Sequence, residues 1–346
     1  MVERAHVPTR PTHHRPPNAP SHVRGLAEVA VASVLWGTGG LAVQLIREQE
    51  ALSPVTISAW RMAIAAVVLL VALLALRRGH ELVALFRARP RQLLAVGVGT
   101  AAYQGFYFVS VTQVGVAVST VVSLGLAPVL LTVAEAVRHR RAPAASRLAV
   151  LGAALVGLVL ISVAGHESSA GPAPVAGVLL AVASGTTYAL TTVAGGSISK
   201  ESSPLVLTSG MTLVGAATLL PCLALVDGPL LTGDPVALGW LAYLGALTMA
   251  LAYVLLYSGL RVVAPSTAVT ASLVEPVTAA VVAAVVLSES LGPAAVVGIV
   301  LVLGAVAGLG RPAAAAGPVL PDPGTSDPGT SGPGTAGPAT QPATDG

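Results

Sequence analysis

Residues 92–136, QLLAVGVGTAAYQGFYFVSVTQVGVAVSTVVSLGLAPVLLTVAEA, carry a single charged side chain, Glu135. A helical crossing of the bilayer core needs about 20 apolar residues. The stretch therefore predicts two crossings, at 92–112 and 115–136, joined by a short turn. Arginines bound the stretch on both sides, at Arg87, Arg89, Arg91, Arg138, Arg140 and Arg141. Both ends of this pair of helices are then expected on the same side of the membrane, because two crossings return the chain to its starting side.

Eight more apolar segments of similar length lie on either side of this pair, at 26–46, 54–76, 147–165, 174–195, 205–226, 236–258, 263–287 and 293–310. The chain is 54% hydrophobic and only 10% charged over 346 residues, with a mean hydropathy of +0.82. This composition excludes a water-soluble domain of this length. We expect an all-α polytopic membrane protein with ten transmembrane helices.

Basic residues orient these helices. Sixteen of the eighteen Lys and Arg residues lie before the first segment, after the last one, or in alternate gaps between segments. The positive-inside rule makes that side cytoplasmic. The prediction is a multi-pass protein of the cytoplasmic (plasma) membrane with both termini inside. The intervening gaps hold one basic residue, Arg47, and six acidic ones.

The two ends of the chain have different compositions from the helices. Residues 1–25 are rich in Pro and His, and residues 311–346 consist mostly of Pro, Gly, Thr, Ala and Ser. Neither segment can bury an apolar core, so we expect a disordered cytoplasmic leader and a disordered cytoplasmic tail. The basic residues form no patch interleaved with aromatics, so nucleic acid is not an expected partner. The single cysteine, Cys222, excludes an internal disulfide.

The membrane part repeats internally. Gly97 precedes Pro128 by 31 residues, and Gly245 precedes Pro276 by the same interval. A Ser-Pro pair opens the second and the seventh segments alike, at Pro54 and Pro204. These matches predict five-helix repeats at 26–165 and 174–310. An odd number of crossings per repeat places the two copies in opposite orientations, an arrangement found in secondary transporters.

Several short motifs follow one another over about residues 26–310: Trp36-Gly37, Ser53-Pro54, Trp60-Arg61, the Pro128 segment, Glu275-Pro276, Ser288-Glu289 and Gly298. In this order they resemble the motifs of EamA-type transporters in the drug/metabolite transporter superfamily. One departure is Arg141, which stands where the spacing of the second half would place a counterpart of Glu289.

The resemblance implies a secondary transporter that moves a small organic solute, such as an amino acid, related metabolite or drug-like compound, by alternating access, with export as the favoured direction. A receptor or scaffold without transport is the alternative. No catalytic motif or Walker motif is present, so we expect neither an enzyme nor ATP coupling within this chain. No cofactor is expected, and the oligomeric state stays open.

Two charged residues lie inside predicted helices. Arg61 stands seven residues inside the second segment, and Glu275 lies near the middle of the ninth. A charge at the helix centre costs roughly 2.5–3.5 kcal/mol, so such residues usually face a partner or a wet cavity. Arg61 has an alternative role as a residue that snorkels to the outer headgroups. Glu275 is either a carrier of a transported proton, the candidate coupling ion, or a protonated structural carboxyl, because burial favours the neutral form.

Aromatic residues and helix breaks complete the predicted site. We expect substrate binding by one central cavity onto which Trp36, Arg61, Tyr103, Tyr107, Tyr188 and Glu275 converge. The alternative for the aromatics is ordinary helix packing. Helix breaks are expected to line the cavity at Gly37, Gly39, Gly40, Pro128 and Pro276. The histidines lack metal-ligand spacing, so no metal site is expected.

A charge pairing follows from the depths of these two residues. At 1.5 Å per residue, Arg61 and Glu275 differ in depth by roughly 8 Å, which their side chains can span together. We therefore predict that they approach one another, directly or through one water or substrate group, in at least one conformation. In the corresponding mechanism an anionic substrate group competes for Arg61 while Glu275 takes up a proton.

Overall fold

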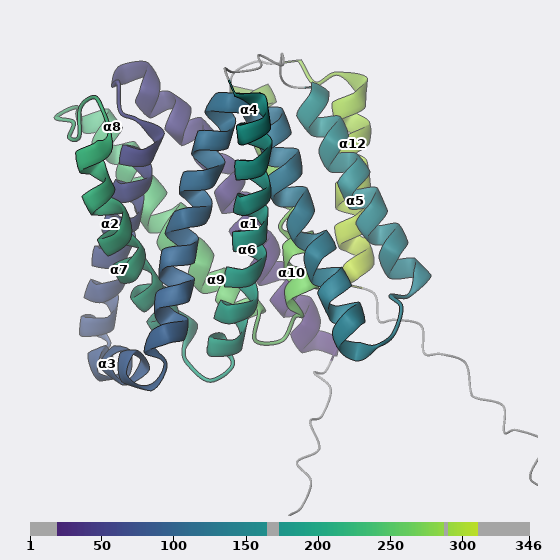
Figure 1. Cartoon of the computed structure of the whole chain (residues 1–346), viewed down its shortest axis with the longest axis horizontal. Coiled ribbons are helices and arrows are strands. Elements are labelled where there is room, and N and C mark those ends of the chain that lie inside the picture. Colours follow the sequence, from purple (N-terminus) through teal and green to yellow (C-terminus); the bar gives the residue numbers. More distant parts are fainter. Residues whose placement is uncertain (1–18, 165–172, 287–289, 311–346) are drawn as a thin grey trace, which may run out of the picture. The chain divides into compact units, whose positions relative to one another are not determined.

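A computed structural model of the chain describes residues 19–164, 173–286 and 290–310. The predicted tail, the leader up to residue 18, the inter-repeat loop at 165–172 and the Ser288-Glu289 motif lie outside the described residues. The described part is helical throughout and contains no strand (Figure 1). Its elements are α1 (Ala19–Gln49), α2 (Pro54–Ala75), α3 (Gly79–Ala88), α4 (Pro90–His139), α5 (Ala145–Ala164), α6 (Pro174–Ser199), α7 (Pro204–Cys222), the 3-10 turn η1 (Leu223–Leu225), α8 (Pro235–Tyr243), the π-helix η2 (Leu244–Leu251), α9 (Ala252–Gly259), α10 (Pro265–Ala271), α11 (Val274–Val286) and α12 (Pro293–Leu309).

Helix length and composition confirm a multi-pass membrane protein. Among the described residues, eight helical segments are long and apolar enough to cross a membrane, and α12 is a shorter apolar helix. Several of these segments begin with a proline at the first turn, where its fixed φ suits the helix and its missing N–H leaves no hydrogen bond unmade. At α2, the Ser53 side chain accepts a hydrogen bond from the backbone of Thr56 and caps the helix.

The chain of α4 reverses direction at Gly115. This residue has φ 79° and ψ 168°, a region that essentially only glycine occupies. The hydroxyls of Tyr107 and Thr120 are 2.8 Å apart, and those of Ser110 and Ser119 are 2.7 Å apart. In an unbroken helix, residues 107 and 120 would stand about 20 Å apart along the axis. α4 is therefore a helical hairpin, with its turn next to the predicted position.

Two sequence-based expectations about the helices were wrong, and one helix was not predicted. α1 begins at Ala19, so residues 19–25 are helical instead of belonging to the leader. α3 lies between the second and third predicted segments, where no helix was predicted, and Leu82 and Leu85 bury one face of it. α4 keeps helical dihedrals through Pro128, where we expected a break. Pro128 removes one backbone hydrogen bond, but the φ of a proline fits a helix. Packing against α6 is compatible with a continuous helix at this point of α4.

Small residues bring the helices into close contact. A Cβ added to Gly157 on α5 would lie 2.6 Å from the carbonyl oxygen of Gly298 on α12, and the reverse contact has the same length. The same kind of contact joins Gly25 on α1 to Gly259 on α9. Inside a membrane, helices associate chiefly by close packing, because lipid is as apolar as the side chains. These glycines therefore fix helix pairs that larger residues would separate.

Ion pairs and hydrogen bonds gather at the end of the bundle where α3 lies. Arg89, directly after α3, pairs with Glu201 in the loop after α6. Arg147 on α5 pairs with Glu135 on α4 at 2.6 Å and also contacts Ser266 on α10. Two of these contacts join the first half of the chain to the second half.

The turn at Gly115 gives a stability prediction. Gly115→Ala should lower the free energy of unfolding by about 1–3 kcal/mol, because alanine would be held in a glycine-only conformation. Gly105→Ala is the matched control: it lies on the same element, and its added Cβ would meet nothing within 4 Å. Equilibrium unfolding in mixed micelles measures both. Equal effects of the two substitutions would contradict the assigned turn.

Candidate functional site

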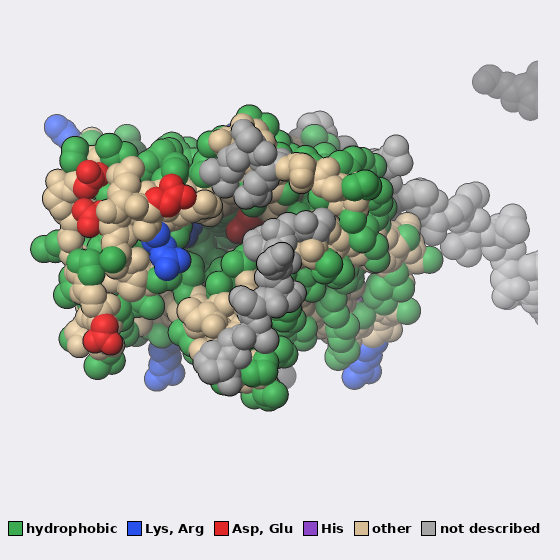
Figure 2. Space-filling view, turned by 90° about the horizontal axis from the view of Figure 1, so that it is seen from above, with side chains coloured by type: hydrophobic (Ala, Val, Ile, Leu, Met, Phe, Trp, Pro, Cys, Tyr) green, Lys and Arg blue, Asp and Glu red, His purple; other side chains and the backbone are tan. Residues whose placement is uncertain are grey.

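A cavity of about 520 Å³ lies among α1, α4, α5, α6, α11 and α12. Its mouth lies near Gln44, Ser290 and Leu291, where α1 ends and α12 begins. Figure 2 shows the hollow on the face at the top of Figure 1, with an acidic side chain at depth. The α3 end of the bundle, with its ion pairs, is opposite. The cavity therefore opens at one end of the bundle.

Glu275 is positioned by an interruption in the ninth predicted segment. α10 ends at Ala271, and Ser272 and Leu273 form a turn before α11 begins. Pro276 explains the interruption, since its ring would clash with the carbonyl of Ser272 in a continuous helix. Gly37 lets α1 approach this turn closely, because a Cβ there would lie 2.5 Å from the Glu275 carbonyl oxygen.

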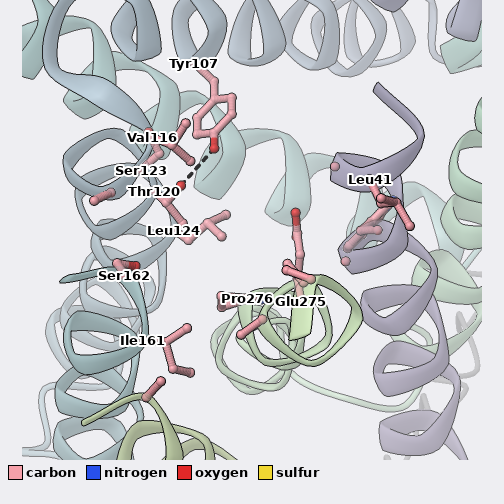
Figure 3. A pocket seen from close by; sticks show the side chains of 18 of the residues that line it. Leu41, Tyr107, Val116, Thr120, Ser123, Leu124, Ile161, Ser162, Glu275 and Pro276 are labelled. Atoms are coloured by element: carbon pink, nitrogen blue, oxygen red, sulfur yellow. Dashed lines mark hydrogen bonds between the residues drawn. The ribbon is translucent and has the colours of Figure 1, made fainter. Parts of the chain in front are cut away.

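The Glu275 carboxylate is available to a ligand. Figure 3 shows its side chain pointing into the cavity, between Tyr107 and Thr120 on α4 and Leu41 on α1. No hydrogen bond or ion pair to this carboxylate is found among the described residues. A partly buried carboxylate without a partner is costly, so a bound group would relieve its desolvation.

Four predicted aromatic residues line the same cavity. Tyr103 and Tyr188 stack with ring centres 5.4 Å apart, and the Tyr188 hydroxyl donates to Ser272 at 3.3 Å. Tyr107 is held by its hydroxyl contact with Thr120. Trp36 packs its edge against Tyr253, with ring centres 5.2 Å apart. The structure thus brings Trp36, Tyr103, Tyr107, Tyr188 and Glu275 together, as the sequence predicted, while their role in binding stays a prediction.

Arg61 does not line the cavity in this structure, which corrects one expectation. Its guanidinium donates to the Thr248 carbonyl at 3.0 Å, and its Nε is buried without an acceptor among the described residues. The bonded carbonyl belongs to η2, a π-helix. Arg61 forms no ion pair with Glu275. A direct pairing is therefore absent here, and pairing in another conformation stays a prediction.

The predicted breaks in α1 were wrong. α1 is helical from Ala19 to Gln49, so its glycines serve packing and space instead of a kink. Gly37 and Gly40 line the cavity, whereas Gly39 faces Leu244 on the other side. Of the two prolines, Pro276 lines the cavity and Pro128 does not.

Several polar wall residues were not predicted. Gln44, Thr120, Ser162 and Ser184 line the cavity. Isolated hydroxyls in a membrane helix usually bond their own backbone or a neighbouring helix, so the sequence alone could not select them. Ser123 shows this behaviour, because its hydroxyl donates to the Ala181 carbonyl of α6 at 3.1 Å. Within the described residues, no group of three His, Cys, Asp or Glu side chains could hold a metal.

The cavity gives an accessibility prediction. In a Cys222→Ser background, Thr120→Cys should react with a charged, water-soluble thiosulfonate, because a thiol needs water around it to form the reactive thiolate. Ser209→Cys is the matched control, since Ser209 is buried on α7 outside the cavity and should stay unreactive. Mass spectrometry of the labelled protein measures both. Similar labelling at the two positions would contradict a water-filled cavity.

Comparisons with known proteins agree with this architecture. The model of the EamA-like transporter family matches residues 23–163 and matches again at 175–311. A protein of Bacillus subtilis (strain 168), described as "Uncharacterized transporter YwfM", is 33% identical over 276 residues, covering 80% of this chain and 90% of that protein. A solved structure described as "Crystal structure of protein" has a TM-score of 0.70 at 21% identity, covering 84% of this chain and 97% of the other, and supports the fold. The chain therefore belongs to the EamA-like transporter family, with one copy of the family unit in each half.

Proposed function

We propose that the protein is a secondary transporter that carries a small organic solute across the cytoplasmic membrane through the central cavity. The observation that carries this proposal is the cavity itself, open at one end and containing the unpaired carboxylate of Glu275. Its volume, about 520 Å³, lies within the range of roughly 300–1,000 Å³ typical of small-molecule sites. Family membership supports transport as the general activity.

The topology that we propose has ten crossings. The eight long helical segments give ten if the two arms of α4 are counted separately and α12 is added. Five crossings in each matched unit then require inverted repeats, with both termini cytoplasmic according to the basic residues. In this orientation, the cavity mouth faces outward, and the ion pairs of Arg89 and Arg147 close the cytoplasmic end.

Transport in this proposal alternates between outward-open and inward-open conformations. Opening the cytoplasmic end requires the contacts between Arg89 and Glu201 and between Arg147 and Ser266 to separate, since each joins the two halves. Ion pairs exposed at a surface are individually weak, at about 0–1 kcal/mol, so they can break and re-form during a cycle. Export is the favoured direction, with release from the outward-open state.

Glu275 is the residue that we propose for coupling to a proton gradient. It faces the cavity, so water can deliver a proton to it. No side chain among the described residues forms a hydrogen bond or an ion pair with its carboxylate. No nucleotide-binding motif is present in the sequence, which favours a gradient as the energy source. Arg61 has a positioning role in this proposal, because it holds the η2 backbone through Thr248.

A non-transporting receptor or scaffold is the alternative function. The test is counterflow of a panel of labelled cationic, neutral and anionic solutes into proteoliposomes loaded with the same unlabelled solute. The proposal predicts transient accumulation of at least one solute. A correctly folded protein that accumulates none of them would favour the alternative.

A cavity-filling substitution tests whether the solute passes through this cavity. Gly40→Trp should abolish counterflow, because Gly40 lines the cavity and its added side chain would occupy open space there. Gly152→Trp is the matched control: it makes the same change on α5, also where a Cβ meets nothing, but outside the cavity. Retained counterflow in folded Gly40→Trp would place the pathway elsewhere.

A further inference from the structure

We infer that the cavity selects organic monocations, either protonated amines or quaternary ammonium compounds. This inference rests on the proposed function and names the substrate class for the same cavity. It arises from the charged and aromatic side chains that line the cavity in the structure. It also replaces the anionic group that the sequence alone suggested for Arg61.

The first support is the charge of the cavity wall. Among the described residues that line it, Glu275 is the only charged one, and no Lys or Arg reaches the wall. Its carboxylate points into the cavity without a hydrogen bond or an ion pair from any described residue. An anionic solute would meet this carboxylate with no basic residue beside it, whereas a cation would supply the missing partner.

The position of Arg61 supports the same selection. Arg61 is not among the residues that line the cavity, and its guanidinium already donates to the Thr248 carbonyl. It therefore adds no basic side chain to the wall that a solute meets in this structure.

Aromatic faces are the second independent support. Trp36, Tyr103, Tyr107 and Tyr188 line the same cavity as the carboxylate. The negative faces of aromatic rings attract ammonium groups, most strongly in a desolvated site, and several rings together recognise quaternary ammonium ions. Apolar residues from other helices, including Leu124, Ile161 and Ala280, complete the wall and can accommodate hydrocarbon substituents.

The experiment measures binding of labelled benzyltrimethylammonium to the purified full-length protein in lipid nanodiscs. This probe keeps its charge at every pH. Three unlabelled competitors have nearly the same shape: choline is cationic, 3,3-dimethyl-1-butanol is neutral, and 3,3-dimethylbutanoate is anionic. Choline should displace the probe at concentrations on the order of 10-fold below those needed for the neutral analogue, and the anion should be the weakest.

Two variants assign the selectivity to the carboxylate. Glu275→Gln should weaken probe binding by on the order of 10- to 100-fold, whereas Glu275→Asp should retain the preference for choline. Glu48→Gln is the matched control, because Glu48 lies near the same end of α1, outside the cavity, and accepts a hydrogen bond from Gln44. Its binding should match that of the wild type.

Other outcomes would overturn the inference. Unchanged probe binding in folded Glu275→Gln, or no probe binding by the folded wild type, rules out selection by the carboxylate. Stronger competition by 3,3-dimethylbutanoate that is lost in Arg61→Gln would assign an anionic substrate class. If the protein gives any of these binding results but still shows counterflow of a neutral or anionic solute, the transporter proposal stands and only the cation class is rejected.

Discussion

The bilayer core offers no water to the peptide backbone, and the arrangement of the site depends on this constraint. Backbone groups that leave the helical pattern must be covered by protein or face a cavity. The π-helix η2 receives the Arg61 guanidinium at Thr248, and the turn at Ser272 and Leu273 leads directly into Glu275 at the cavity. At η2 the charged side chain satisfies a carbonyl of the irregular backbone, whereas the Glu275 carboxylate is left to the cavity.

The all-helical membrane architecture and the placement of the long apolar helices could be predicted because lipid imposes a length and a composition on every crossing. The hairpin of α4 follows from an apolar stretch that is too long for one crossing and bounded by arginines. α3 was missed because its charged residues hide an apolar face too short to suggest a crossing. Proline position alone did not predict a break, since Pro128 lies in a continuous helix whereas Pro276 follows a turn.

The aromatic and acidic residues that line the cavity could be predicted because large polar side chains in the middle of a membrane helix need a partner or a wet cavity. The position of a residue along a helix, however, does not determine which side of the helix its side chain faces. Arg61 donates to the η2 backbone at Thr248 and does not line the cavity, which changes the charge that a solute encounters there. The hydroxyls of Thr120 and Ser162 could be identified as wall residues only once the fold placed them on the same cavity as Glu275.

Transport by alternating access requires the cavity mouth to close when the cytoplasmic end opens. Gln44 on α1 and Val116 on α4 both line it and are exposed, so spin labels at these positions would report the width of the opening. Pulsed electron–electron double resonance on the protein in lipid nanodiscs measures the distance between the labels. The account predicts two distance populations whose proportions shift when benzyltrimethylammonium is added. A single population that stays unchanged by this cation and by every solute active in counterflow would contradict it.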